Sequence, residues 1–158
     1  MQSKKSYTVD QAKQKMESFC AYQERCHKEV IQKLIHMNMI PEVIDVIVVH
    51  LISNGFLNEE RFAKTFARGK FRIKKWGKQR ITQELKQRDI TKTLIVNAIA
   101  DISDHDYLNA FHELAEKKAT TLTSSNIQKN KKQLTDYLLY RGWESHLVYE
   151  KVRELYAE

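Results

Sequence analysis

Seven apolar positions recur three times along this 158-residue chain, at closely matching intervals. The copies align when Leu34 is matched with Leu85 and Leu138. Leu85 lies 51 residues after Leu34, and Leu138 lies 53 residues after Leu85. The aligned triplets are Val30, Ile81 and Leu134; Leu34, Leu85 and Leu138; Met39, Ile90 and Trp143; Val43, Leu94 and Leu147; Ile44, Ile95 and Val148; Val48, Ile99 and Val152; and Leu51, Ile102 and Leu155. A repeat of this length indicates a modular array.

The spacing within each copy is helical. Apolar residues follow one another at three and four residues, and four glycines with one proline leave little room for hairpins. Four residues after each aligned leucine stands Asn38, Asp89 or Gly142, a residue type that tolerates a left-handed backbone, and an apolar residue follows it. This arrangement predicts a Schellman stop inside each copy, after which Pro41 can open the next helix.

A longer helix is expected before each of these pairs, with Thr8, Asn58 and Ser103 at its start. We therefore predict an all-α fold of three tandem three-helix repeats that form an elongated, curved helical array. The expected units are residues 8–54, the basic unit 58–102, and 103–157, with residues 1–7 as a flexible tail and Thr120–Asn130 as a mobile connector.

Several function classes lack their sequence signals. Cys20 and Cys26 have no matching ligands for zinc, so we expect buried thiols. No apolar run approaches bilayer length, and the polar N-terminus lacks a secretion signal, which predicts a cytoplasmic protein with no membrane partner. There is no phosphate-binding loop, nucleophile elbow or metal spacing among the six histidines. We expect no catalytic residue, no cofactor and no metal.

The segment from Arg61 to Arg88 concentrates the positive charge. It holds eleven lysines and arginines and one acid, Glu84, for a net charge of +10, whereas the whole chain carries +7. On a helical wheel the cations Arg61, Lys64, Arg68, Arg72 and Lys75 share one face of a helix expected from Asn58 to about Lys75, and Phe62, Phe66 and Ile73 form a packing stripe. Lys70 and Lys74 lie beside that stripe, and Lys78 and Arg80 open the next helix after Trp76 and Gly77.

A charged helix face is often only solvated, and such faces usually mix both signs at i,i+4 spacing. Here Lys64, Arg68 and Arg72 follow one another at that spacing without an intervening acid. We interpret the segment as a surface for a polyanion, or for a protein that coats one, bound by phosphate neutralisation. The alternatives are a direct DNA- or RNA-binding protein with a helix-turn-helix-like unit, as in transcription factors, and a scaffold for an acidic protein.

Three segments together resemble the RecX family of recombination regulators. They are Gly-Phe-Leu-Asn-Glu-Glu-Arg-Phe-Ala at 55–63, Trp-Gly-Lys-Gln-Arg-Ile at 76–81 and Glu-Leu at 84–85. The turn Arg141-Gly142-Trp143 is similar to the family's Arg-Gly-aromatic turn, and the resemblance runs from about residue 8 to about residue 156. The chain departs from the pattern at Cys26, where Ser is common, and at Asp89, where Gly is common.

This resemblance implies a bacterial, non-enzymatic protein of three three-helix units that lies in the groove of the RecA–single-stranded DNA filament. It would limit filament growth and the strand-exchange, ATPase and coprotease activities of RecA, and we expect it to act as a monomer. The family's matched basic positions are Arg61, Arg68, Lys70, Arg72, Lys74, Lys78 and Arg80, with a structural role for Arg61 as an equal alternative. Lys64 and Lys75, from the helical wheel, complete the candidate filament- and DNA-binding residues.

Overall fold

The computed structural model describes residues 6–157, and every regular element among them is an α-helix. In chain order the helices are α1 (Val9–Tyr22), α2 (His27–His36), α3 (Pro41–Ser53), α4 (Glu59–Arg72), α5 (Lys78–Gln87), α6 (Lys92–Ala100), α7 (Asp104–Ala119), α8 (Ile127–Tyr140) and α9 (Ser145–Leu155). Within residues 6–157, no helix combines the length and the apolar character needed to cross a membrane.

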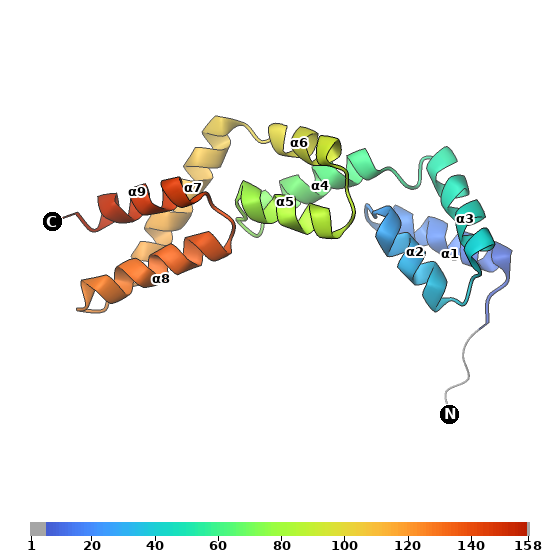
Figure 1. The fold of residues 1–158 in the computed structure, drawn as a ribbon, viewed down its shortest axis with the longest axis horizontal. Coiled ribbons are helices and arrows are strands. Elements are labelled where there is room, and N and C mark those ends of the chain that lie inside the picture. The colour runs from blue at the N-terminus through green and yellow to red at the C-terminus, as the bar shows by residue number, and fades with distance from the viewer. Residues whose placement is uncertain (1–5, 158) are drawn as a thin grey trace, which may run out of the picture.

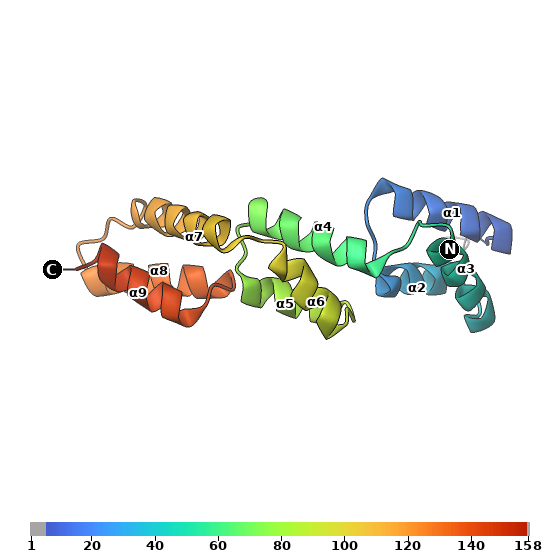
Figure 2. The same ribbon diagram turned by 90° about the horizontal axis from the view of Figure 1, so that it is seen from above.

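The helices are arranged as three consecutive groups of three, α1–α3, α4–α6 and α7–α9. Figure 1 shows the groups placed one after another along an arc, with α1–α3 at one end and α7–α9 at the other. Seen from above, in Figure 2, the same groups follow a nearly straight line. The predicted fold class, an elongated and curved array of three tandem three-helix repeats, is confirmed.

The repeated apolar positions supply the core, as the alignment predicted. The aligned leucines and the residues four positions before them have no exposed surface in any of the three copies. The remaining columns are buried or partly buried in every copy, including Trp143, which is fully enclosed. The repeated apolar positions therefore identify the side chains that each group of helices buries.

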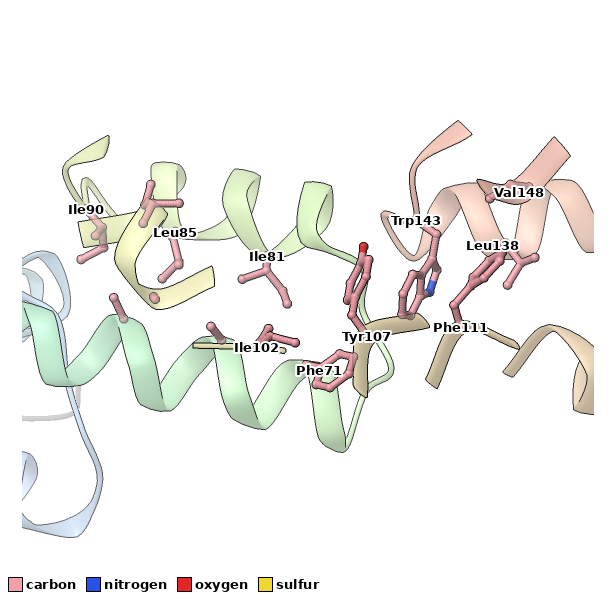
Figure 3. Close-up of a cluster of buried hydrophobic side chains, with 14 of the residues drawn as sticks. Phe71, Ile81, Leu85, Ile90, Ile102, Tyr107, Phe111, Leu138, Trp143 and Val148 are labelled. Carbon is pink, nitrogen blue, oxygen red and sulfur yellow. The ribbon is translucent and has the colours of Figure 1, made fainter. Parts of the chain in front are cut away.

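These buried residues form two cores rather than three. The first core lies within α1–α3 and the following turn, and includes Met16, Leu34 and Leu57. The second core runs without interruption from α4 to α9, so the second and third groups share one hydrophobic interior. Figure 3 shows this continuity, with Tyr107 and Trp143 lying between the side chains of the two groups.

Side-chain caps begin the first helix of each group, at the positions that the sequence predicted. Thr8 and Gln11 form a capping box, in which each side chain accepts a hydrogen bond from the other residue's backbone N–H, at 3.1 and 3.0 Å. Asn58 accepts from the Arg61 N–H at 2.9 Å, and Ser103 accepts from the Asp106 N–H at 3.1 Å. Each cap satisfies a backbone donor that the helix itself cannot pair.

The predicted Schellman stops are also confirmed. Asn38, Asp89 and Gly142 have φ angles of 61°, 59° and 89°, in the left-handed region. The N–H of the apolar residue that follows each one donates to the carbonyl of the aligned leucine, at 3.1, 3.1 and 3.3 Å. Pro41 occupies the first turn of α3, where its missing N–H leaves no helical bond unmade.

The joint between the second and third groups is held by backbone contacts as well as by the shared core. The hydrogen bonds run from Gly77 N to Arg141 O at 2.8 Å, from Gln79 N to Gly142 O at 3.1 Å, and from Trp143 Nε1 to Lys75 O at 3.1 Å. Both glycines are required by the closeness of this approach. A Cβ on Gly77 would lie 2.6 Å from Trp143 N, and a Cβ on Gly142 would lie 2.8 Å from Arg80 Cα.

Some local predictions were wrong. Helix α4 ends at Arg72 instead of continuing to Lys75, and Ile73, expected in the packing stripe, is 78% exposed. Helix α8 begins at Ile127, so the connector expected over Thr120–Asn130 ends at Asn126, and Asn130 is buried. The sequence prediction missed the start of α8 at Ile127 because the first turn of this helix is mostly polar and buries little apolar surface.

The expected tail falls mostly on residues 1–5, which lie outside the described residues. Tyr7, placed in that tail by the sequence, packs partly buried against the first core and accepts a hydrogen bond from Lys15. Both cysteines are free and buried, as predicted.

Candidate polyanion-binding surface

Helix α4 divides its residues between a buried face and a cationic face. Phe62, Ala63, Ala67 and Phe71 are buried and attach the helix to the second core. At about 100° per residue, the opposite side carries Arg61, Lys64, Arg68 and Arg72. The buried face is wider than the aromatic stripe predicted from the sequence, because the two alanines belong to it.

Two cations of this face are engaged within the protein. Arg61 donates from Nε to Glu24 at 2.6 Å and from its guanidinium to Gly55 O at 2.9 Å. It therefore ties α4 to the loop after α1 and to the turn after α3, which is the structural alternative that the sequence left open. Lys64 lies 3.2 Å from Glu60 and 4.0 Å from Asp101.

Four other cations form what we call the outer row, defined as Arg68, Arg72, Lys74 and Lys75. All four are exposed, and among residues 6–157 none of them forms an ion pair with a carboxylate. They cover the last turn of α4 and the turn that follows it. Lys75 has a φ of 59°, in the left-handed region, and the Trp76 N–H donates to Lys70 O, so the helical path ends at this point.

Two acids that helical periodicity did not place here border the outer row: Asp101 at the end of α6 and Asp106 in the first turn of α7. Asp101 and Asp106 line the same small cleft as Arg68 and Arg72, where the end of α6 and the start of α7 approach α4. Asp106 also lies in the first turn of α7, and both carboxylates are 29 or more residues away from the cations they face. The net charge of the segment overestimates the positive potential on this side.

The remaining candidates lie against aromatic rings. Lys70 lies 5.4 and 5.1 Å from the ring centroids of Phe66 and Trp76. Lys78 pairs with Asp104 at 3.6 Å and lies 4.4 Å from the Tyr107 ring. Such contacts attract a cation to the face of a ring and hold it in place.

Arg80 is held in the same way, between two groups of helices. Its guanidinium carbon lies 4.3 Å from the Trp76 ring and 4.7 Å from the Tyr140 ring, and it donates to Tyr140 O at 3.2 Å. The structure thus brings Arg68 and Arg72 into one cleft, and places Lys70 and Arg80 against the same Trp76 ring.

Cations of the third group extend the positive surface beyond the predicted residues. A groove of about 450 Å³ is lined by Lys75 together with Lys117 and Lys118 of α7, and Tyr137 of α8 also lines it. Glu113 is an acid in the same lining. The adjacent Lys-Lys pair near the end of α7 was a visible signal, but only the folded chain brings it beside Lys75.

Tyr107 anchors the joint beneath these surfaces. Its hydroxyl accepts from the Lys78 N–H at 2.9 Å and donates to Glu144 at 2.7 Å. Burial raises the pKa of Tyr107 strongly, and the hydrogen bond to the Glu144 carboxylate adds to that increase. The hydroxyl therefore stays protonated and serves as a fixed bridge between α5 and the start of α9.

The three groups of helices, with exposed cations on α4 and on the turn after it, make this a helical-repeat protein. A family model described as the second three-helix domain of RecX matches residues 58–99. The regulatory protein RecX of Chlorobium phaeobacteroides is 30% identical over 133 residues, which cover 84% of this chain and 85% of that protein. That of Clostridium acetobutylicum is 27% identical over 151 residues, covering 93% and 70%.

The chain belongs to the RecX family. Its fold agrees with the crystal structure of RecX from Lactobacillus salivarius, which aligns with a TM-score of 0.78 over 93% of this chain and 96% of that one. The sequence identity between the two is 21%, so that likeness concerns the fold. The relatives named here are described as regulatory proteins.

Proposed function

We propose that this protein is a non-enzymatic regulator that binds the RecA–single-stranded DNA filament and inhibits its growth, strand exchange, ATPase and coprotease activities. The outer row is the observation that carries this proposal. All four cations are exposed and without ion pairs among residues 6–157, and Arg68 and Arg72 lie one helical turn apart in the lining of the same cleft. Like charges at this spacing oppose one another, and a polyanionic partner would relieve that repulsion.

The shape of the array supports a steric role. Its three groups follow a long arc, so a partner that is itself extended could contact all of them (Figure 1). We propose that the central unit, residues 58–102, lies on the filament, and that the units 8–54 and 103–157 add contacts to neighbouring subunits. A monomer bridging subunits in this way would hinder both their exchange and the entry of a second DNA.

The binding residues proposed here follow the geometry. Arg68, Arg72, Lys74 and Lys75 are the principal contacts, and Lys64 contributes from the edge of the row. Arg61 is assigned to the structure, because Glu24 and two backbone carbonyls occupy its guanidinium. The RecA filament forms inside the bacterial cell, so a cytoplasmic location follows from the same proposal.

Charge reversal tests the proposal directly. Arg68→Glu with Arg72→Glu should leave the helical circular dichroism nearly unchanged, and should abolish inhibition of DNA-dependent ATP hydrolysis by RecA. Lys129→Glu with Arg153→Glu is the matched control, because both residues are exposed in the third group and the change in net charge is the same. This control should inhibit normally. Full inhibition by the folded Arg68/Arg72 variant would exclude the outer row from the mechanism.

A comparison of partners separates this function from the alternatives. Binding to RecA-coated single strands, bare single strands and bare duplex should be measured at physiological salt. We expect the coated strand to bind most tightly and the affinity to fall steeply as salt rises. A preference for one duplex sequence would instead support a transcriptional role, and indifference to every DNA would support a scaffold for an acidic protein.

A further inference from the structure

An open groove of about 500 Å³ lies between α5 and α6, two helices that pack against each other in the second group (Figure 2). Its floor is apolar and follows α6, where Ile95, Val96 and Ile99 line it at spacings of three and four residues. Val96 is 55% exposed, so the described part of the chain leaves this apolar stripe partly in water. We call this feature the α5–α6 groove.

Two lysines without acidic partners stand at one end of the α5–α6 groove. Lys86 lies in the last turn of α5, and Lys92 is the first residue of α6, so only the turn between the helices separates them. Both are exposed, and within residues 6–157 neither forms an ion pair with a carboxylate. The acid of that turn, Asp89, instead faces Lys28 of α2 at 3.9 Å. This end of the groove therefore presents positive charge to a ligand.

The opposite end of the groove is close to neutral. Lys78, the first residue of α5, lines it and pairs with Asp104 at 3.6 Å. Lys78 and Lys86 are eight residues apart on α5, so the groove extends about 12 Å along that helix. The groove is thus an apolar stripe about two helical turns long, with its free charge at one end.

The repeat fold does not require these two lysines. At the positions of Lys86 and Lys92 the first group has Ile35 and Pro41, and the third group has Leu139 and Ser145. As the first residue of α6, Lys92 also lies where a cation opposes the helix dipole. The two lysines are therefore particular to the second group, and stability of the repeat does not explain them.

An amphipathic helix with acidic residues beside its apolar stripe matches this groove in both shape and charge. Helices dock in apolar grooves through side chains at i, i+3, i+4 and i+7, and the groove has room for about two turns. Acids favour the first turn of a helix, so the N-terminal turn of the docked helix would lie beside Lys86 and Lys92. A nucleic acid could use the two lysines, but no aromatic ring lines the groove to stack a base, and the apolar stripe would stay uncovered.

We propose that the α5–α6 groove binds an acidic amphipathic helix of a partner protein. The apolar side of that helix packs on Val96 and Ile99, and its N-terminal acids pair with Lys86 and Lys92. This site goes beyond the proposed function, because it takes a protein segment instead of a polyanion, requires no DNA, and lies on α5 and α6, whereas the outer row lies on α4 and the turn after it.

The probe is a fluorescein-labelled peptide of about 15 residues, long enough to form a helix on binding. It carries two glutamates in its first turn and leucines at i, i+3, i+4 and i+7 on a background of alanine and glutamine. Binding to the full chain is measured by anisotropy. Val96→Glu places a charge in the apolar stripe and should weaken binding by at least about tenfold. Val46→Glu is the matched control, since Val46 is 64% exposed on α3, outside the groove, and it should bind normally.

Charge reversal tests the lysines separately. Lys86→Glu with Lys92→Glu should weaken binding of the same peptide by about tenfold or more, because two attractive pairs become repulsive. A second peptide with lysines in place of its glutamates should show the reverse preference and bind this variant more tightly than the natural protein. Lys129→Glu with Arg153→Glu again controls for net charge, and should bind the first peptide with no more than a small loss.

Four results would overturn the proposal. They are a dissociation constant for the natural protein weaker than about 1 mM, normal binding by Val96→Glu, equal binding of a peptide whose leucines are scrambled off one face, and equal losses in the groove variants and their controls. A thymidine oligonucleotide is the comparison ligand. If reversal of Lys86 and Lys92 weakens the oligonucleotide but not the peptide, these lysines serve a nucleic acid and the proposal also fails.

The outcome is separable from that of the proposed function, because Val96→Glu leaves Arg68 and Arg72 in place. If this variant binds the peptide normally while reversal of Arg68 and Arg72 abolishes RecA inhibition, only the α5–α6 groove is refuted. If Val96→Glu loses the peptide while the Arg68/Arg72 variant still inhibits RecA, the groove stands and the outer row falls. Circular dichroism of each variant confirms that the helices are kept.

Discussion

Gly77→Ala is the sharpest test of the joint between the second and third groups. The φ of Gly77 is −80°, which alanine adopts without strain, so any cost of the substitution is steric. The added Cβ would lie 2.6 Å from both Gly142 C and Trp143 N, and closer still to Gly142 O. These are backbone atoms, so the neighbour cannot move aside by changing a rotamer. The joint must open.

The expected cost follows from the contacts that opening would disturb. Two backbone hydrogen bonds, from Gly77 to Arg141 and from Gln79 to Gly142, would lengthen or break. At about 1 kcal/mol net for each bond, with about 1–3 kcal/mol for the overpacked contact, the free energy of unfolding should fall by about 3–5 kcal/mol.

Gly69→Ala is the matched control for this prediction. Gly69 lies inside α4, and a Cβ there would meet nothing within 4 Å. Because alanine favours the helix over glycine, this variant should be stabilised by about 0.5–1 kcal/mol. The same substitution is thus expected to have opposite signs at two glycines only eight positions apart.

Urea unfolding followed by tryptophan fluorescence measures both variants. The chain has two tryptophans, Trp76 and Trp143, and both lie at this joint, so the signal reports the relevant contacts. A Gly77→Ala variant as stable as the natural protein would refute the close backbone approach. A loss of stability in Gly69→Ala of the same size would show that the reasoning about available space is wrong.

Three further predictions concern the core, the caps and the thiols. Leu85→Ala should cost about 2–5 kcal/mol in urea unfolding, whereas Ile73→Ala, on an exposed side chain, should stay within about 0.5 kcal/mol; equal effects would contradict the assigned register. Asn58→Ala should cost about 1 kcal/mol through the lost cap, measured in the same way, and no loss would argue against the cap. Burial raises the pKa of Cys20 and Cys26 to about 11, so labelling by a thiol reagent at pH 8 should be at least about 100-fold slower in the native protein than in urea. The folded state holds the thiol protons more tightly than the unfolded state does, so the free energy of unfolding should fall as the pH rises from about 9 toward 11. An increase in the free energy of unfolding over this pH range would contradict the burial of the thiols.

The parts of the fold that were predictable depend on local chemistry. Thr8 and Asn58 cap helices through residues three positions away, and Asn38 ends a helix through its own backbone conformation. All the residues that form each of these caps and stops lie within about one helical turn, so the sequence alone is enough to predict them. The burial of the seven repeated apolar positions was predictable for the same reason, because it depends only on which face of its own helix each residue occupies.

The candidate site was less predictable because its electrostatics depend on distant residues. Arg61 meets Glu24 across 37 positions, and Trp143 donates to Lys75 across 68. Helical periodicity carries no information about such pairs. The helical wheel also placed Ile73 in the packing stripe, but this residue follows the last residue of α4 and its side chain is 78% exposed. The cationic character of α4 was visible in the sequence, while the division into engaged and free cations required the structure.

The two joints of the array differ in chemistry, and this difference has a mechanical consequence. The joint after the second group is built from a shared apolar core around Trp143 and from backbone hydrogen bonds. The joint after the first group relies mainly on polar contacts, such as Arg61 with Glu24 at 2.6 Å and His27 with Glu59 at 3.4 Å, beside the buried Cys26.

Salt screens exposed ion pairs but leaves apolar burial in place, so ionic strength acts unequally on these two joints. In a repeat array, stability depends on each unit and on its contact with the next one. The second and third groups should therefore unfold together as one cooperative body, and the first group should couple to them more weakly as salt rises. The outer row lies on that body, so its cations should keep their positions relative to the third group as salt rises.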